Sequence, residues 1–76
     1  MREDPMSSRN QHVVPRNGRW AVRAAGSPTP TRVCPTQREA IVVAREIARG
    51  QRSELLIHGR DGRIREKSTY LDPTRS

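Results

Sequence analysis

The sequence predicts an α+β domain of ββαββ order, with a four-stranded antiparallel sheet and one helix packed on one face. Two turn dipeptides, Asn17-Gly18 and Asp61-Gly62, each interrupt a run of alternating apolar and basic residues. Both dipeptides favour tight hairpin turns, because each residue of such a turn needs a positive φ. Between them, apolar residues recur over 36–50 at the spacing of an amphipathic helix. Hairpin, helix and hairpin therefore follow one another along the chain.

The first hairpin is predicted over residues 11–25. A two-residue loop at its centre places Arg16 opposite Arg19 and Pro15 opposite Trp20. The side chains that then point toward the helix are Val13, Pro15, Trp20, Val22 and Ala24. Because proline has no amide donor and is tolerated at sheet edges, the first strand is expected to be an edge strand.

A long loop and then a single helix are predicted for the middle of the chain. Residues 26–35 hold three prolines and a glycine, which suit neither a helix nor a central strand. Val33 is expected to reach back from this loop over the core. Thr36 and Glu39 have the spacing of a capping box, and Gly50 is a natural stop for the helix. The apolar stripe of this helix is Ala40, Ile41, Ala44, Ile47 and Ala48.

The second hairpin is predicted over residues 53–70. With Asp61-Gly62 as its loop, Arg60 lies opposite Arg63, and strict alternation pairs the preceding residues in turn. The inward set is then Leu55, Ile57, Gly59, Ile64, Glu66, Ser68 and Tyr70. An inward Glu66 is unfavourable, because a buried carboxylate needs a partner. A position at the sheet margin or a β-bulge would relieve it.

The 76 residues are enough for one small domain, predicted over residues 11–73, with a disordered N-terminal tail at 1–10 and a C-terminal tail at 74–76. Only 32% of the residues are apolar, with one Trp and no Phe, so the core is small. Homodimerisation is a common remedy for a core of this size.

The net charge of +7 belongs to the predicted domain and not to its tails. Residues 11–70 contain 12 basic and five acidic side chains, whereas the flanking residues balance. A folded basic surface favours polyanions such as nucleic acid. Fourteen of the 15 basic residues are Arg, as a GC-rich genome would also favour, but codon bias does not explain the shortage of acids.

Other classes of function have little support in the residues. Cys34 with His12 or His58 lacks the orienting group that a nucleophile and base need, so no catalytic residue is assigned and the chain is expected not to be an enzyme. The widely spaced Cys and His residues predict no metal site, and no cofactor or small-molecule substrate is indicated. The absence of an apolar membrane span and the single Cys34 predict a cytoplasmic protein that does not bind membranes.

Several short segments in a fixed order resemble a known bacterial family. They are HVVP at 12–15, GRWAV at 18–22, TQREAI at 36–41 and ELLIHGRDGRIR at 54–65. Together they resemble the domain-of-unknown-function family numbered twenty-one eighty-eight, over about residues 11–73. The resemblance implies a compact bacterial module and brings no activity or catalytic residue with it.

Two functions remain open, and both use the sheet face opposite the helix. The first is binding of DNA or RNA phosphates, for which the predicted residues are Arg16, Arg19, Arg23, Arg60, Arg63, Arg65 and Lys67. The second is a protein interface or homodimer seam, whose apolar centre would be Val14, Ala21 and Leu56. This face has no exposed aromatic side chain on which single-stranded bases could stack.

Overall fold

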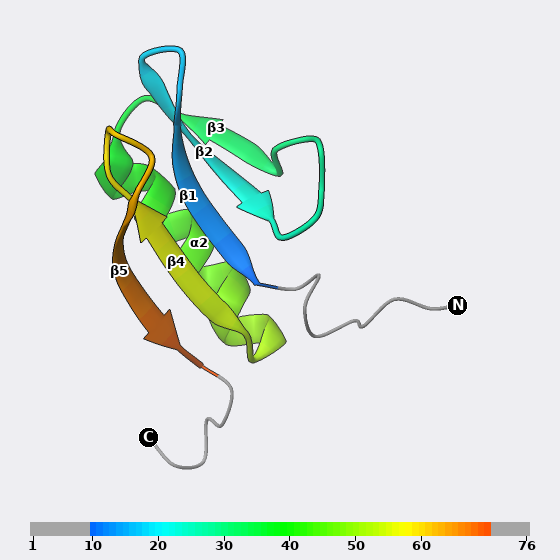
Figure 1. Ribbon diagram of the computed structural model, residues 1–76. Coiled ribbons are helices and arrows are strands. Elements are labelled where there is room, and N and C mark those ends of the chain that lie inside the picture. The colour runs from blue at the N-terminus through cyan, green and yellow to red at the C-terminus, as the bar shows by residue number, and fades with distance from the viewer. Residues whose placement is uncertain (1–9, 71–76) are drawn as a thin grey trace.

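Five strands form one mixed sheet in the computed structural model, which describes residues 10–70 (Figure 1). The strands are β1 (Gln11–Arg16), β2 (Arg19–Ala24), β3 (Arg32–Cys34), β4 (Glu54–His58) and β5 (Ile64–Thr69). Their order across the sheet is β3-β2-β1-β4-β5, and the helix α2 (Gln37–Gln51) covers one face. The α+β class is therefore confirmed, whereas the predicted four-stranded antiparallel sheet is wrong. Most of the predicted tails lie outside the described residues.

The first hairpin has the predicted register. Arg16 pairs with Arg19 and Pro15 pairs with Trp20. Asn17 and Gly18 have φ values of 48° and 80°, the positive values that their turn requires. The polar residue before the hairpin is also ordered, because Asn10 accepts hydrogen bonds from the amides of Glu54 at 3.1 Å and Ala25 at 2.8 Å.

The Pro-rich segment predicted as a loop contains the short edge strand β3. Ala21 pairs with Val33, and Trp20 pairs with Cys34. Prolines at 30 and 35 flank the strand without interrupting it, and an edge strand pairs on one side only. Val33 does not cover the core as expected. It lies on the face away from the helix and is 41% exposed, while Cys34 is buried beneath the helix.

β1 lies at the centre of the sheet between β2 and β4, so the predicted edge position is wrong. Its pairing with β4 is parallel and extends only from Gln11 to Val13. Pro15 lies beyond this ladder, where no amide donor toward β4 is needed. A central strand therefore tolerates Pro15, because the β4 ladder ends two residues before it.

One helix returns the chain across the full length of the sheet. Its 15 residues span about 22 Å at 1.5 Å per residue, close to the roughly 20 Å of a six-residue strand. The predicted cap is confirmed, since the hydroxyl of Thr36 accepts a hydrogen bond from the Glu39 amide at 3.2 Å. The helix ends at Gln51 and not at Gly50, and the C-cap residue Arg52 adopts the left-handed conformation.

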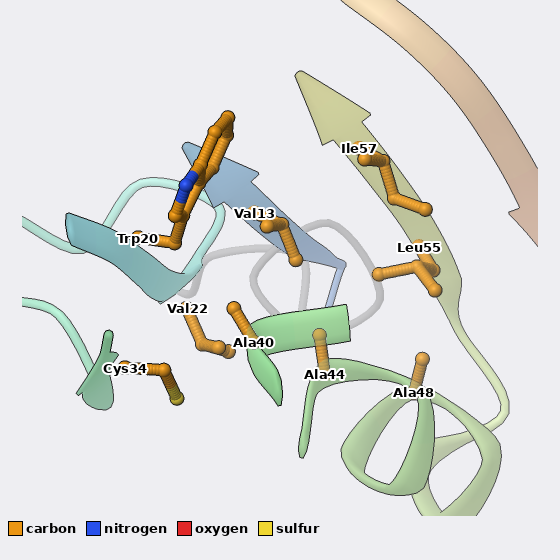
Figure 2. Packing of buried hydrophobic residues seen from close by; sticks show 9 residues of the cluster. All are labelled: Val13, Trp20, Val22, Cys34, Ala40, Ala44, Ala48, Leu55 and Ile57. Atoms are coloured by element: carbon orange, nitrogen blue, oxygen red, sulfur yellow. The ribbon is translucent and has the colours of Figure 1, made fainter. Parts of the chain in front are cut away.

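The core lies between α2 and the sheet (Figure 2). Three fully buried alanines of α2, at positions 40, 44 and 48, let the helix approach the strands closely. The strand side chains that meet them are Val13, Trp20, Val22, Cys34, Leu55 and Ile57. The members from β1, β2 and β4 agree with the predicted inward alternation, whereas Cys34 of β3 was not among the predicted inward residues. Tyr70 packs against the margin of the core.

The second hairpin departs from strict alternation at a β-bulge. Ile57 pairs with Glu66 as predicted, but His58 pairs with Ile64 and not with Arg65. The loop is longer than two residues, because the Gly59 amide donates to the carbonyl of Arg63 at 2.8 Å. Ile64 was predicted to point inward, yet it shares a row with His58 and is 56% exposed. Glu66 is exposed on the edge strand β5, where its carboxylate stays hydrated.

Candidate functional site

Both hairpin turns lie at the same end of the sheet, together with the start of α2 (Figure 1). The parallel pairing of β1 with β4 brings the ends of these two strands side by side. Five arginines gather there, which we call the basic end: Arg16, Arg19, Arg60, Arg63 and Arg65. All five are exposed. The structure thus joins residues that lie more than 40 positions apart in the chain.

The basic end has little internal neutralisation. Arg63 faces Asp61 across 3.9 Å, with side chains that are 88% and 66% exposed, and such surface pairs contribute little. Among residues 10–70, no carboxylate lies within ion-pair distance of the other four arginines. Arg16 and Arg19 lie directly opposite each other, an arrangement that raises the local positive potential. An anion placed here would relieve that repulsion.

Arg65 is on a different side from the predicted one. Because of the bulge it does not pair with His58 on the open sheet face, and its Nη1 donates to Oε1 of Gln37 at 3.2 Å. Gln37 in turn donates from Nε2 to the carbonyl of His58 at 3.1 Å. The amide of Gln37 therefore connects the first turn of α2 to both strands of the second hairpin. Sequence reasoning did not single out Gln37.

Two adjoining hollows lie on the helix side of the basic end, and we call them together the Trp20 cleft. The first has a volume of about 260 Å³ and is lined by Trp20, Thr36, Gln37, Arg60 and Arg65, among others. The second, about 280 Å³, shares Trp20 and Arg60 with the first and adds Arg19. Trp20 is 8% exposed, and Figure 2 shows its indole extending beyond the other core side chains.

The sheet face opposite α2, here called the open face, carries the remaining predicted residues in two cross-strand rows. Arg23, His12, Leu56 and Lys67 form one row. Lys67 lies 3.8 Å from Glu54, which leaves it less free than predicted. The second row contains Val33, Ala21 and Val14, with the His58–Ile64 pair at its other side. Ala21 was predicted as an exposed interface residue, but it is 1% exposed because its neighbours cover it.

Two histidines on the open face are hydrogen-bonded to each other. His58 Nδ1 lies 2.8 Å from the carbonyl of Gly62, so this nitrogen carries the proton. The Nε2 of a neutral His58 then accepts, and His12 Nδ1 donates to it across 2.9 Å. Burial lowers the pKa of His12 below its ordinary value of 6.5, and the nearby His58 and Arg23 lower it further. The sequence shows two isolated histidines and gives no sign of this pair.

We expect the stability of the domain to fall as the pH drops below about 6.5. The folded state holds His12 with a lowered pKa, so the unfolded chain binds more protons in the window below 6.5. The contribution of His12 to the free energy of unfolding is then constant above pH 6.5. It decreases as the pH falls from 6.5 toward the pKa of His12 in the folded state. One such proton limits the slope to about 1.4 kcal/mol per pH unit. Urea unfolding between about pH 7.5 and 5.5 measures it.

His12→Gln is the matched control for this pH dependence, because glutamine keeps a polar side chain without a titratable ring. The slope of stability against pH should be smaller in the variant than in the parent protein. An identical slope in both proteins would show that other groups are responsible.

Cys34 and the histidines lie on opposite faces of the sheet. Cys34 is 4% exposed in the core on the helix side, whereas His12 and His58 belong to the open face. Within residues 10–70 no three His, Cys, Asp or Glu side chains are grouped as a metal ion would need.

No helix in that same part of the chain is long and apolar enough to cross a membrane.

Fold and site together define a small α+β domain with one strongly basic end and no acidic side chain to neutralise most of it among the described residues. The family model of DUF2188, described as an uncharacterized protein conserved in bacteria, matches residues 11–70, and the chain belongs to this family. It is 32% identical over 62 residues to the uncharacterized protein YdaT of Bacillus subtilis strain 168. That match covers 82% of this chain and 41% of the relative. No solved structure matches the chain significantly.

Proposed function

We propose that this domain is a non-enzymatic module that binds nucleic acid by contacting phosphates through its basic end. The observation that supports this most is the gathering of five exposed arginines from two distant turns. Arginine and lysine contacts to phosphates supply most of the sequence-independent affinity for nucleic acid. Arg23 and Lys67 add two further basic side chains on the open face, where the apolar row separates them from the turns.

The charge distribution fits polyanion binding better than ordinary surface solvation. A solvated surface usually intersperses both signs of charge, whereas Asp61, beside Arg63, is the one carboxylate among the described residues within ion-pair distance of the five arginines. Recognition by stacking has no support on the open face, because its described side chains include no Phe, Tyr or Trp. Phosphate contacts therefore dominate the proposal, and base contacts play no part in it.

A second candidate function is a protein interface or homodimer seam on the open face. The apolar row supports it, because Val33 and Ile64 are 41% and 56% exposed at its two sides and half-buried Val14 lies between them. An apolar centre with a basic rim is typical of protein interfaces. In this alternative the open face forms the contact with the partner, and the basic end contributes only its positive charge.

A salt series tests the first function against the second. The purified protein is titrated with labelled duplex DNA, single-stranded DNA and RNA from low to physiological salt, while light scattering gives its oligomeric state. Phosphate binding predicts a linear fall of log affinity with log salt, with a slope of about −0.9 per phosphate on duplex DNA.

Ile64→Arg separates the two surfaces in the same experiment. It should leave nucleic-acid affinity unchanged or higher, and it should break any dimer that uses the apolar row. Binding that vanishes well below physiological salt, together with a dimer that Ile64→Arg dissociates, would reject the first function in favour of the second.

A further inference from the structure

We infer that the Trp20 cleft binds a phosphate monoester attached to a sugar, as at the 5′ end of a nucleic-acid strand. This inference rests on the proposed function and assigns a distinct subsite within it. The exposed turns suit the continuous phosphate backbone of a nucleic-acid strand, whereas a hollow at the end of the sheet suits the terminal phosphate of such a strand. The first hollow of the cleft, lined by the guanidinium groups of Arg60 and Arg65, is the main observation behind it.

The size of the cleft agrees with one nucleotide. Its two hollows measure about 260 Å³ and 280 Å³ and meet at Trp20 and Arg60. Arg60 and Arg65 line the first hollow, while Arg19 reaches the second. A phosphate in the first hollow would place its sugar toward the second, beside the edge of the indole.

The charge of the first hollow matches a monoester better than a diester. A phosphate monoester carries nearly two negative charges at neutral pH, and a diester carries one. Arg60 and Arg65 supply two positive charges, and no carboxylate among the described residues lies within ion-pair distance of either. Guanidinium groups can bind phosphate oxygens through two parallel hydrogen bonds, which adds geometric selection to charge.

Arg65 is held in place before any ligand arrives. Its Nη1 is fixed by Gln37 Oε1, and the same Gln37 amide is anchored on the His58 carbonyl. This arrangement leaves the other guanidinium donors of Arg65 for a ligand and reduces the ordering that binding would require. Gln37 is therefore a positioning residue.

The single tryptophan provides a local probe of the cleft. The full chain is titrated with one oligonucleotide in two forms, with a 5′-phosphate and with a 5′-hydroxyl, and with a nucleoside monophosphate. Each titration is followed by the indole N–H cross-peak of Trp20 in a nitrogen–proton NMR spectrum. We expect the 5′-phosphorylated strand to bind about ten-fold tighter than the hydroxyl form, with a saturable shift of the indole signal.

Arg65→Gln should bring the two affinities close together, and Arg65→Lys should restore only part of the difference, because lysine keeps the charge without the planar fork. Arg38→Gln is the matched control. Arg38 is exposed in the first turn of α2, next to Gln37, but it does not line the cleft. Circular dichroism verifies that each variant is folded.

The outcomes separate this inference from the proposed function. Equal, salt-dependent binding of both strand forms with a stationary indole signal would overturn the cleft site and leave the proposed function in place. Absence of binding by all three ligands would overturn both. A nucleoside monophosphate that binds as tightly as the phosphorylated strand would confirm the monoester site and assign it to free nucleotides.

Discussion

Replacing Arg16 and Arg19 together by Gln should weaken duplex DNA binding about 10- to 100-fold at physiological salt and lower the salt slope by about two. Both side chains are exposed at the tip of the first hairpin, where they oppose each other. Each is expected to release about one counterion from the duplex when it contacts a phosphate. Fluorescence anisotropy with a labelled duplex over a salt series gives affinity and slope in one experiment.

The loss should come from lost contacts and not from unfolding. Like charges directly opposite each other destabilise a hairpin, so the double variant should be at least as stable as the parent. Arg45→Gln with Arg49→Gln is the matched control, because it removes the same charge from exposed positions in the second half of α2. An equal loss of affinity in this control would show that binding reports only the net charge of the protein.

Leu55→Ala should lower the free energy of unfolding by about 2–5 kcal/mol. Leu55 is 1% exposed and lies between β4 and the alanines of α2, as Figure 2 shows. Alanine leaves a cavity there, since the buried side chains of α2 that face Leu55 are Ala44 and Ala48, which are too short to fill it. Small domains have about 5–15 kcal/mol of total stability, so the change removes a large part of it.

Leu56→Ala is the control for this prediction, because it deletes the same atoms one residue away on the open face. Leu56 is only half-buried, so the expected cost is about 1 kcal/mol or less. Urea unfolding followed by circular dichroism measures both. Similar losses in the two variants would contradict the placement of the core on the helix side of β4.

Local sequence patterns were sufficient to predict the structure wherever neighbouring residues determine the backbone conformation. The register of the first hairpin follows from Asn17-Gly18, because this dipeptide favours a two-residue turn in which both φ values are positive. The beginning of α2 follows from the Thr36 cap, and the core follows from alternation along β1, β2 and β4. The basic residues of both turns were therefore predictable as exposed groups.

The second hairpin shows where alternation alone fails. A single extra residue in β5 moves Ile64 to the open face and directs Arg65 toward Gln37. The loop of residues 59–63 is closed by its own hydrogen bonds, and Asp61 also accepts one from the Arg63 amide at 3.0 Å. A tight turn at Asp61-Gly62 and this longer loop share the same turn residues, so the sequence pattern does not distinguish them.

The sequence by itself determined the hairpin turns, the helix, the apolar faces and the excess of exposed arginine. Only the tertiary structure decided where the arginines meet, and the three residues of β3 are the reason. With four strands, α2 would begin where β1 begins, and β4 would run antiparallel to β1 with its turn at the far end. β3 runs antiparallel to β2 and brings the chain back to the end of the sheet where β1 ends, so α2 begins there. Because α2 is as long as the sheet, it returns the chain to the opposite end, and β4 then runs parallel to β1. Both turns then share one end, and their charges form one surface.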